Sequence, residues 1–204
     1  MTNAATESSE DVLAFWFGTD TGDAAALAYG AKRWFAASAG FDEEIHERYG
    51  ALVDSAMAGE LDEWRAGASS WLALLLLLDQ FPRNLNRRSR LAYAGDESAL
   101  KVLLEGIRQG LDRELPLARR MFAYMPLQHA ENRSLQAMSV ALFDAVATEA
   151  PAELRAQFEY FAEFARRHRD VVERFGRFPH RNADLGRETT PEERAHLAAH
   201  PQGF

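Results

Sequence analysis

The chain has 204 residues, no cysteine and a formal net charge of −8 at pH 7. With 47% hydrophobic and 26% charged residues, its composition is that of a globular protein, and its length suffices for one domain with a substantial core. The absence of cysteine excludes disulfides, thiolate metal ligands and cysteine nucleophiles, which fits a reducing cytoplasm. The acidic balance argues against a nucleic-acid partner, because binding to phosphate backbones needs a net basic face.

The amino-terminal segment lacks the features of a secretory signal. Glu7, Glu10 and Asp11 come before the first apolar stretch, and no basic residue does. The longest apolar run, residues 71–78, is too short to cross a bilayer and predicts a helix buried on most of its circumference. We therefore expect a cytoplasmic protein with no membrane partner, in which residues 1–8 are disordered.

Helical periodicity runs through the sequence, and period-2 runs bounded by hairpin turns are missing from it, so we predict an all-α fold. The predicted helices cover residues 9–17, 23–37, 42–58, 70–81, 96–109, 115–124, 128–148, 151–175 and a short segment from 191, with a turn at 62–65 and an irregular connection at 83–95. No linker divides the sequence, which predicts a single domain, residues 1–204, built as a bundle or as a right-angled stack of antiparallel helix pairs.

Some of these boundaries depend on specific residues. Pro82 and Pro126 are expected to end the helices that precede them, because a proline disfavours helical conformation in the residue before it. Asp96 is expected to cap the helix that follows it. Thr190-Pro191, with Glu193 three residues after the threonine, forms a capping box for the last helix.

The polar chemistry is concentrated in residues 174–187. This segment holds four arginines, a histidine and an asparagine among two glycines, a proline and two phenylalanines, and Gly176 suits a left-handed helix cap. A rigid cationic loop backed by aromatic rings suits an anion. The predicted ligand-binding residues are Arg83, His129, Glu131, His168, Arg177, His180, Arg181, Asn182 and Arg187.

Two acids and one histidine fall on apolar faces. Asp79 follows eight apolar residues, and a buried carboxylate must be paired or protonated, so we predict a structural ion pair with Arg83, Arg177 or Arg181. Glu131 shares the buried face of the helix predicted at 128–148 and is expected to be paired too. His168 lies on the apolar stripe of 151–175; such a histidine is commonly a core residue, but this one comes two turns before the cationic loop.

Established catalytic and cofactor signatures are missing from the sequence. It contains no phosphate loop, no G-x-G-x-x-G, no H-E-x-x-H and no G-x-S-x-G. No two of His129, His168 and His180 have metal-ligand spacing on one predicted helix. We therefore predict no metal and no cofactor, and no catalytic residue is assigned.

Several segments together resemble a known family. They are Val12-Leu13-Ala14-Phe15-Trp16-Phe17-Gly18, Trp34-Phe35 with Phe41-Asp42, Leu78-Asp79-Gln80-Phe81-Pro82-Arg83-Asn84, Met125-Pro126-Leu127-Gln128-His129-Ala130-Glu131 with Gln136, and residues 168–187. The chain resembles the bacterial family named domain of unknown function 924, and the resemblance covers nearly its whole length. It implies a tetratricopeptide-like stack of helices and no activity. The family pattern has His-Ser-Glu where this chain has His129-Ala130-Glu131, which argues against a serine nucleophile.

Three functions fit these observations. The first is a binding module that holds an anionic small molecule, or a peptide carboxylate or phosphate, through the Arg/His/Asn loop. The second is an enzyme on an anionic substrate, with His129, His168 or His180 as general acid or base. The third is a structural network that locks helix ends in a protein whose surface binds a protein partner. The sequence gives no indication of the oligomeric state.

Overall fold

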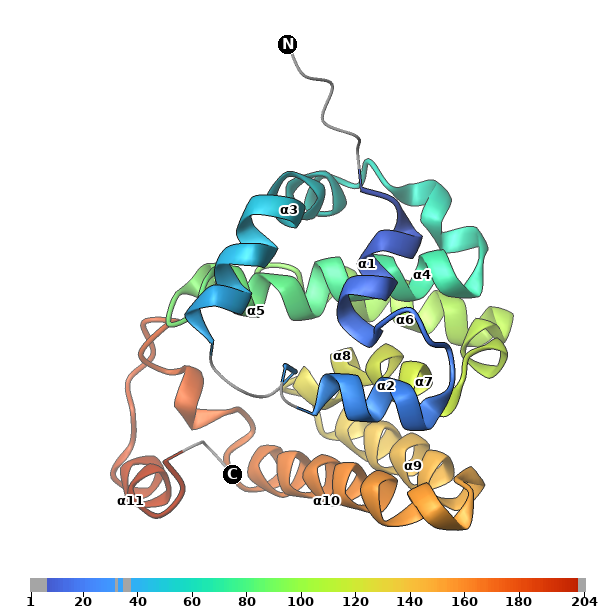
Figure 1. Cartoon of the computed structure of the whole chain (residues 1–204). Helices are drawn as coiled ribbons and strands as arrows, with labels where there is room; N and C mark the ends of the chain where they lie inside the picture. Colours follow the sequence, from blue (N-terminus) through green and yellow to red (C-terminus); the bar gives the residue numbers. More distant parts are fainter. Residues whose placement is uncertain (1–6, 32, 35–37, 202–204) are drawn as a thin grey trace. The chain divides into compact units, whose positions relative to one another are not determined.

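The computed structural model describes residues 7–31, 33–34 and 38–201, and its regular elements in these ranges are all helical. The chain divides into two compact units, each described by itself: Met1–Arg87 with Leu91–Ala123, and Arg88–Arg90 with Tyr124–Phe204 (Figure 1). In the described ranges no helix is both long enough and apolar enough to cross a membrane.

The first unit contains helices of very different lengths. They are α1 (Ser9–Phe17), α2 (Asp23–Gly30), α3 (Ala39–Ala58), the 3₁₀ helix η1 (Asp62–Ala66), α4 (Ala68–Leu75), the π-helix η2 (Leu76–Gln80), α5 (Phe81–Leu85), α6 (Asp96–Gln109), the 3₁₀ helix η4 (Leu111–Glu114) and α7 (Leu117–Ala123). The 3₁₀ helix η3 (Arg90–Tyr93) begins with a residue assigned to the second unit.

Helix α4 forms the centre of the first unit, as the apolar run predicts. It packs against α1, α6 and α7, and every residue from position 71 to 79 is buried. Gly106 allows α6 to pack tightly against α4, because a Cβ atom at this position would lie only 2.2 Å from the Trp71 ring. The Trp71 indole nitrogen donates to the Val102 carbonyl at 2.9 Å, so burial of this ring leaves its donor satisfied.

The prediction that Pro82 ends the central helix is wrong. The helix widens into the π-helix η2, and the chain then continues as α5, in which Pro82 occupies the first turn. A proline in a first turn sacrifices no hydrogen bond, because its missing N–H would have no partner within the helix. Before Pro126, in contrast, the preceding helix α7 does end, at Ala123, and the proline stands in the first turn of α8 (Met125–His129).

The ends of two other helices differ from their predicted positions for tertiary reasons. The helix predicted at 115–124 begins at Leu117, where the Asp23 carboxylate accepts a hydrogen bond from the Ala118 N–H at 2.7 Å and caps the first turn. Asp96 does not cap α6; Gly95 is the N-cap residue, and the Asp96 carboxylate instead pairs with Arg83 at 2.9 Å. Asp23 is 95 positions from Ala118, and Arg83 is 13 positions from Asp96, so neither contact is local in sequence.

The second predicted helix, 23–37, is also shorter than expected. Helix α2 ends at Gly30, and Arg33 and Trp34 follow in a turn and a bend. Residues 32 and 35–37 of that prediction, including Phe35, lie outside the described residues. The same is true of residues 1–6 in the segment expected to be disordered, whereas Ser8 is the N-cap of α1.

The second unit is built on a helical hairpin. Its elements are α8, α9 (Arg133–Glu149), α10 (Ala152–Phe175), the 3₁₀ helix η5 (Pro179–Arg181) and α11 (Pro191–Ala199). Helices α9 and α10 pack along each other and are joined through residues 150–151 (Figure 1). As predicted, Gly176 has a left-handed φ of 72° after α10, and Thr190 with Glu193 forms a capping box at the start of α11.

The single helix predicted at 128–148 is broken, contrary to expectation. Helix α8 ends at His129, and Asn132 caps α9 by accepting from the Leu135 N–H at 3.1 Å. The buried Gln136 amide fills the break: its nitrogen lies within 2.7–3.3 Å of the carbonyl oxygens of residues 127, 128 and 130. A side chain thereby supplies the donor that a continuous helix would have given to these carbonyls.

Candidate functional site

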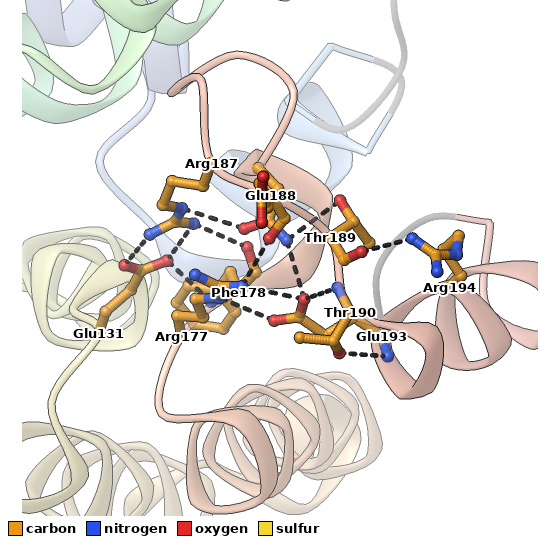
Figure 2. Close-up of polar contacts among 10 residues, drawn as sticks. Glu131, Arg177, Phe178, Arg187, Glu188, Thr189, Thr190, Glu193 and Arg194 are labelled. Carbon is orange, nitrogen blue, oxygen red and sulfur yellow. Dashed lines mark hydrogen bonds and ion pairs between the residues drawn. The ribbon is translucent and has the colours of Figure 1, made fainter.

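The cationic segment of the sequence forms the loop between α10 and α11, and two carboxylates fix it in place. The first is Glu131, in the break between α8 and α9. Its oxygens accept from both terminal nitrogens of Arg187, at 2.6 and 2.9 Å, and from the Phe178 N–H at 2.7 Å (Figure 2). Burial raises the pKa of Glu131, but these hydrogen bonds outweigh it and leave the pKa below its ordinary value.

The second carboxylate is Glu193, in the first turn of α11. It accepts two hydrogen bonds from Arg177, at 2.7 and 3.0 Å, and one from the Thr190 N–H at 2.8 Å (Figure 2). The Arg177 hydrogen bond is the largest cause of a pKa of about 2 for Glu193, which is only 2% exposed. The side chain is therefore ionised at neutral pH and holds both the loop and the helix start.

Asn182 connects the two carboxylate pairs. It is fully buried; its oxygen accepts from Arg187 Nε at 3.0 Å, and its nitrogen donates to Glu193 at 3.2 Å. Arg177, Arg187 and Asn182 thus take part in bonds that close the loop on itself. We call these three residues, together with Glu131 and Glu193, the frame of the loop.

Within this frame, three basic side chains surround one aromatic ring. Phe178 is fully buried, and the ring centroids of His168 and His180 lie 5.5 and 5.6 Å from its own. The guanidinium carbon of Arg181 lies 4.6 Å from the same centroid, within cation–π range. His168 comes from α10 and the other two from η5, so the loop brings together groups from two elements.

These basic groups influence one another electrostatically. Burial is the main cause that lowers the pKa of His168 to about 3, and His129, His180 and Arg181 lower it further. Burial, followed by Arg181, lowers the pKa of His180 to about 4, although Glu131 and Asp184 oppose the change. Both imidazoles are therefore neutral at pH 7.

The tautomer of His168 follows from its contact. Its Nδ1 lies 2.8 Å from the Phe164 carbonyl oxygen, which can only accept a hydrogen bond. In the neutral ring, Nδ1 therefore carries the proton and Nε2 has the lone pair. His168 is 6% exposed, so it lies in the core beside the loop.

Asp79 and Arg83 lie in the first unit and pair with each other there. The Asp79 carboxylate is 3.1 Å from the Arg83 guanidinium, which also contacts Asp96, so the predicted buried ion pair is present. The sequence left three possible partners for Asp79, and the nearest in sequence is the one observed. The widened π-turn brings positions 79 and 83 to this distance despite Pro82 between them.

Two features of the site were missed in the sequence. Glu193 was identified only as part of a capping box, but its bonds to Arg177 and Asn182 come from distant positions. Phe178 was identified only as backing for the loop, and no local signal shows that three basic groups gather around it. In the described ranges, no three histidine, aspartate or glutamate side chains are placed to hold a metal ion together.

Comparisons with other proteins agree with this architecture but assign no activity. The structure of a protein of unknown function from Agrobacterium tumefaciens is similar to the chain, with a TM-score of 0.80 and 39% sequence identity over 94% of this chain and 97% of that one. No curated protein matches the chain. The model of the family described as bacterial protein of unknown function (DUF924) matches residues 12–200. The chain therefore belongs to this family.

Proposed function

We propose that the second unit is a binding module for an anion, such as a small molecule or a peptide that carries a carboxylate or phosphate. The groups that would contact the anion are His129, His168, His180 and Arg181. The observation that supports this best is the gathering of two histidines and an arginine around the buried Phe178 ring. An arginine stays charged at every physiological pH, and imidazoles beside it become additional donors once they are protonated.

The frame explains why such a site would be ready to bind. Glu131 and Glu193 hold Arg187 and Arg177 in two-pronged pairs, and Asn182 connects them. We propose that these five residues position the loop and do not contact the ligand. Because the backbone is already fixed, little conformational entropy would be lost on binding. The proposed site does not include Arg83, which has Asp79 and Asp96 as partners.

We further propose that the helices form a tetratricopeptide-like stack of antiparallel pairs within a single domain. The family membership and the α9–α10 hairpin support this arrangement. A cytoplasmic location, without a nucleic-acid or membrane partner, is proposed from the acidic composition and the absence of cysteine.

A second candidate function has its own supporting observation. Arg177 and Arg187 each form a bidentate ion pair with a carboxylate, as expected of a structural network that holds helix ends together. In that case the protein would act through surface contacts with a partner protein. No observation specifically favours catalysis over binding.

Thermal unfolding distinguishes these candidates. Phosphate, sulfate and acetate, at constant ionic strength, should raise the melting temperature of the parent protein, because a ligand of the native state stabilises it. Arg181→Met keeps most of the side-chain volume but removes the charge, and it should abolish the increase. Arg108→Gln, an equal charge change at an exposed position of α6, should preserve it. If no anion stabilises the parent and Arg181→Met only lowers its stability, the structural lock is the better account.

A further inference from the structure

Three buried side chains near the break between α8 and α9 carry polar atoms without a hydrogen-bond partner. Among the described residues, these atoms are the amide oxygens of Gln128 and Gln136 and the hydroxyl oxygen of Ser139. The side chains are 5%, 0% and 0% exposed. Buried polar atoms nearly always have a partner in folded proteins, so this group needs an explanation.

Protein stability does not explain these atoms. A nonpolar side chain in place of Gln128, or an alanine in place of Ser139, would remove the unsatisfied oxygen at that position. Gln136 is different. Its amide nitrogen forms hydrogen bonds that stabilise the helix break, and only its oxygen has no hydrogen-bond partner. We therefore expect a molecule other than the protein chain to form hydrogen bonds with these three atoms.

The position of these atoms relates them to the basic groups. The Gln136 nitrogen bonds the carbonyl oxygens of Gln128 and Ala130, the residues on either side of His129. Ser139 comes three positions after Gln136 and therefore shares its face of α9. Glu131, the residue after Ala130, accepts a hydrogen bond from the Phe178 N–H at 2.7 Å. The helix break that the Gln136 amide fills is therefore in direct contact with the residue at the centre of the basic cluster.

We infer that the ligand is an anion joined to a hydroxyl or amide N–H group, and that Gln128, Gln136 and Ser139 bind this second group. The inference rests on the proposed anion site. The two amide oxygens can only accept hydrogen bonds, so the ligand must supply donors there, while the serine hydroxyl can donate or accept. A hydroxy acid satisfies this requirement, and so does an acylated amino acid such as the carboxyl end of a peptide.

Matched ligands test the inference in the full-length protein. Acetate has the anion alone, glycolate adds a hydroxyl, and N-acetylglycine adds an amide N–H. We expect calorimetric titration to show glycolate or N-acetylglycine binding about tenfold more tightly than acetate, the effect of one well-made hydrogen bond to a buried group. Preference for glycolate identifies a hydroxy acid as the ligand class, and preference for N-acetylglycine identifies an acylated amino acid.

Two variants then assign the effect to these residues. In Ser139→Ala and Gln128→Met, the affinity ratio to acetate should fall toward one, while the affinity for acetate itself stays unchanged. Ser139→Ala should not melt below the parent, because it removes a hydroxyl that has no partner in the free protein. Thr148→Ala, which removes an exposed hydroxyl from the same helix, is the matched control and should keep the ratio.

The possible failures are distinguishable. If acetate binds the parent but glycolate and N-acetylglycine bind no more tightly, the inference is wrong and the proposed anion site remains. A ratio that persists in both variants also overturns it. If a crystal structure with the preferred ligand shows only water molecules bound to the two amide oxygens, these atoms bind buried water and the inference is wrong. If none of the three ligands binds, both proposals fail.

Discussion

Glu131 and Arg187, 56 positions apart in the chain, form a two-pronged ion pair with nitrogen–oxygen distances of 2.6 and 2.9 Å. The same carboxylate accepts from the Phe178 N–H, so one side chain fixes Arg187, near the end of the loop, and Phe178, near its start. The two side chains are 24% and 22% exposed, so water screens the pair only in part. The position of the basic cluster therefore depends on this contact.

Glu131→Gln should lower the free energy of unfolding by about 1–3 kcal/mol, because it leaves the Arg187 guanidinium without its charged partner. Urea denaturation measures the loss. Glu192→Gln is the control: it disrupts the pair with Arg174, whose side chains are more than half exposed, and should cost less than about 1 kcal/mol. Equal losses in the two variants would show that the Glu131 pair has no special structural role.

Leu75→Asp should prevent folding. Leu75 is 1% exposed at the centre of the first unit, and a carboxylate there would be buried without a partner. Circular dichroism and thermal melting report the outcome. A variant that keeps the parent's cooperative melt would place α4 at the periphery instead.

Acid should destabilise the protein in two stages. The folded-state pKa values of His168 and His180, about 3 and about 4, lie below the unfolded value of about 6.5, so the unfolded chain binds protons first as the pH falls. Stability should therefore be full above about pH 6.5 and decrease toward pH 4, by up to about 1.4 kcal/mol per pH unit for each histidine. Urea titrations of the parent and His180→Gln, which should have a shallower slope, measure this. Identical slopes would contradict the buried, neutral state of His180.

The second stage comes from Glu193. Its folded-state pKa, about 2, lies below the unfolded value of about 4.3, so the stability it contributes is present above pH 4.3 and is lost as the pH falls toward 2. Glu193→Gln should remove this part of the pH dependence and leave the part above pH 5 unchanged. If the variant instead loses the dependence near pH 6, the assignment of the two stages is wrong.

Local signals were sufficient to predict some of these features. The capping box of Thr190 and Glu193 and the left-handed Gly176 depend on residues within one turn, so the sequence alone determines them. The apolar run at 71–78 likewise identifies the central helix. The pairing of Asp79 with Arg83 was one of several possibilities, because a proline intervenes.

Other features depend on contacts between distant residues. Asp23 caps α7 from 95 positions away, and no pattern near Ala118 reveals it. The break after His129 is stabilised by Gln136, whose amide replaces helix hydrogen bonds that periodicity alone would assume. A proline signal is ambiguous in itself, because Pro82 is compatible with the end of one helix or the first turn of the next. The gathering of basic groups around Phe178 has the same tertiary origin.

The central claim is that an anion binds among His129, His168, His180 and Arg181, and imidazole NMR during a phosphate titration at about pH 6.5 tests it most directly. Because a bound anion favours protonated imidazole, the ring signals of His168 and His180 should move toward those of the protonated form as phosphate is added. Signals of His46 and His200, on exposed parts of α3 and at the end of α11, should stay where they are. Arg181→Met should prevent the movement. If phosphate leaves the signals of His168 and His180 unchanged, or shifts those of His46 and His200 by as much, the basic cluster is not an anion site.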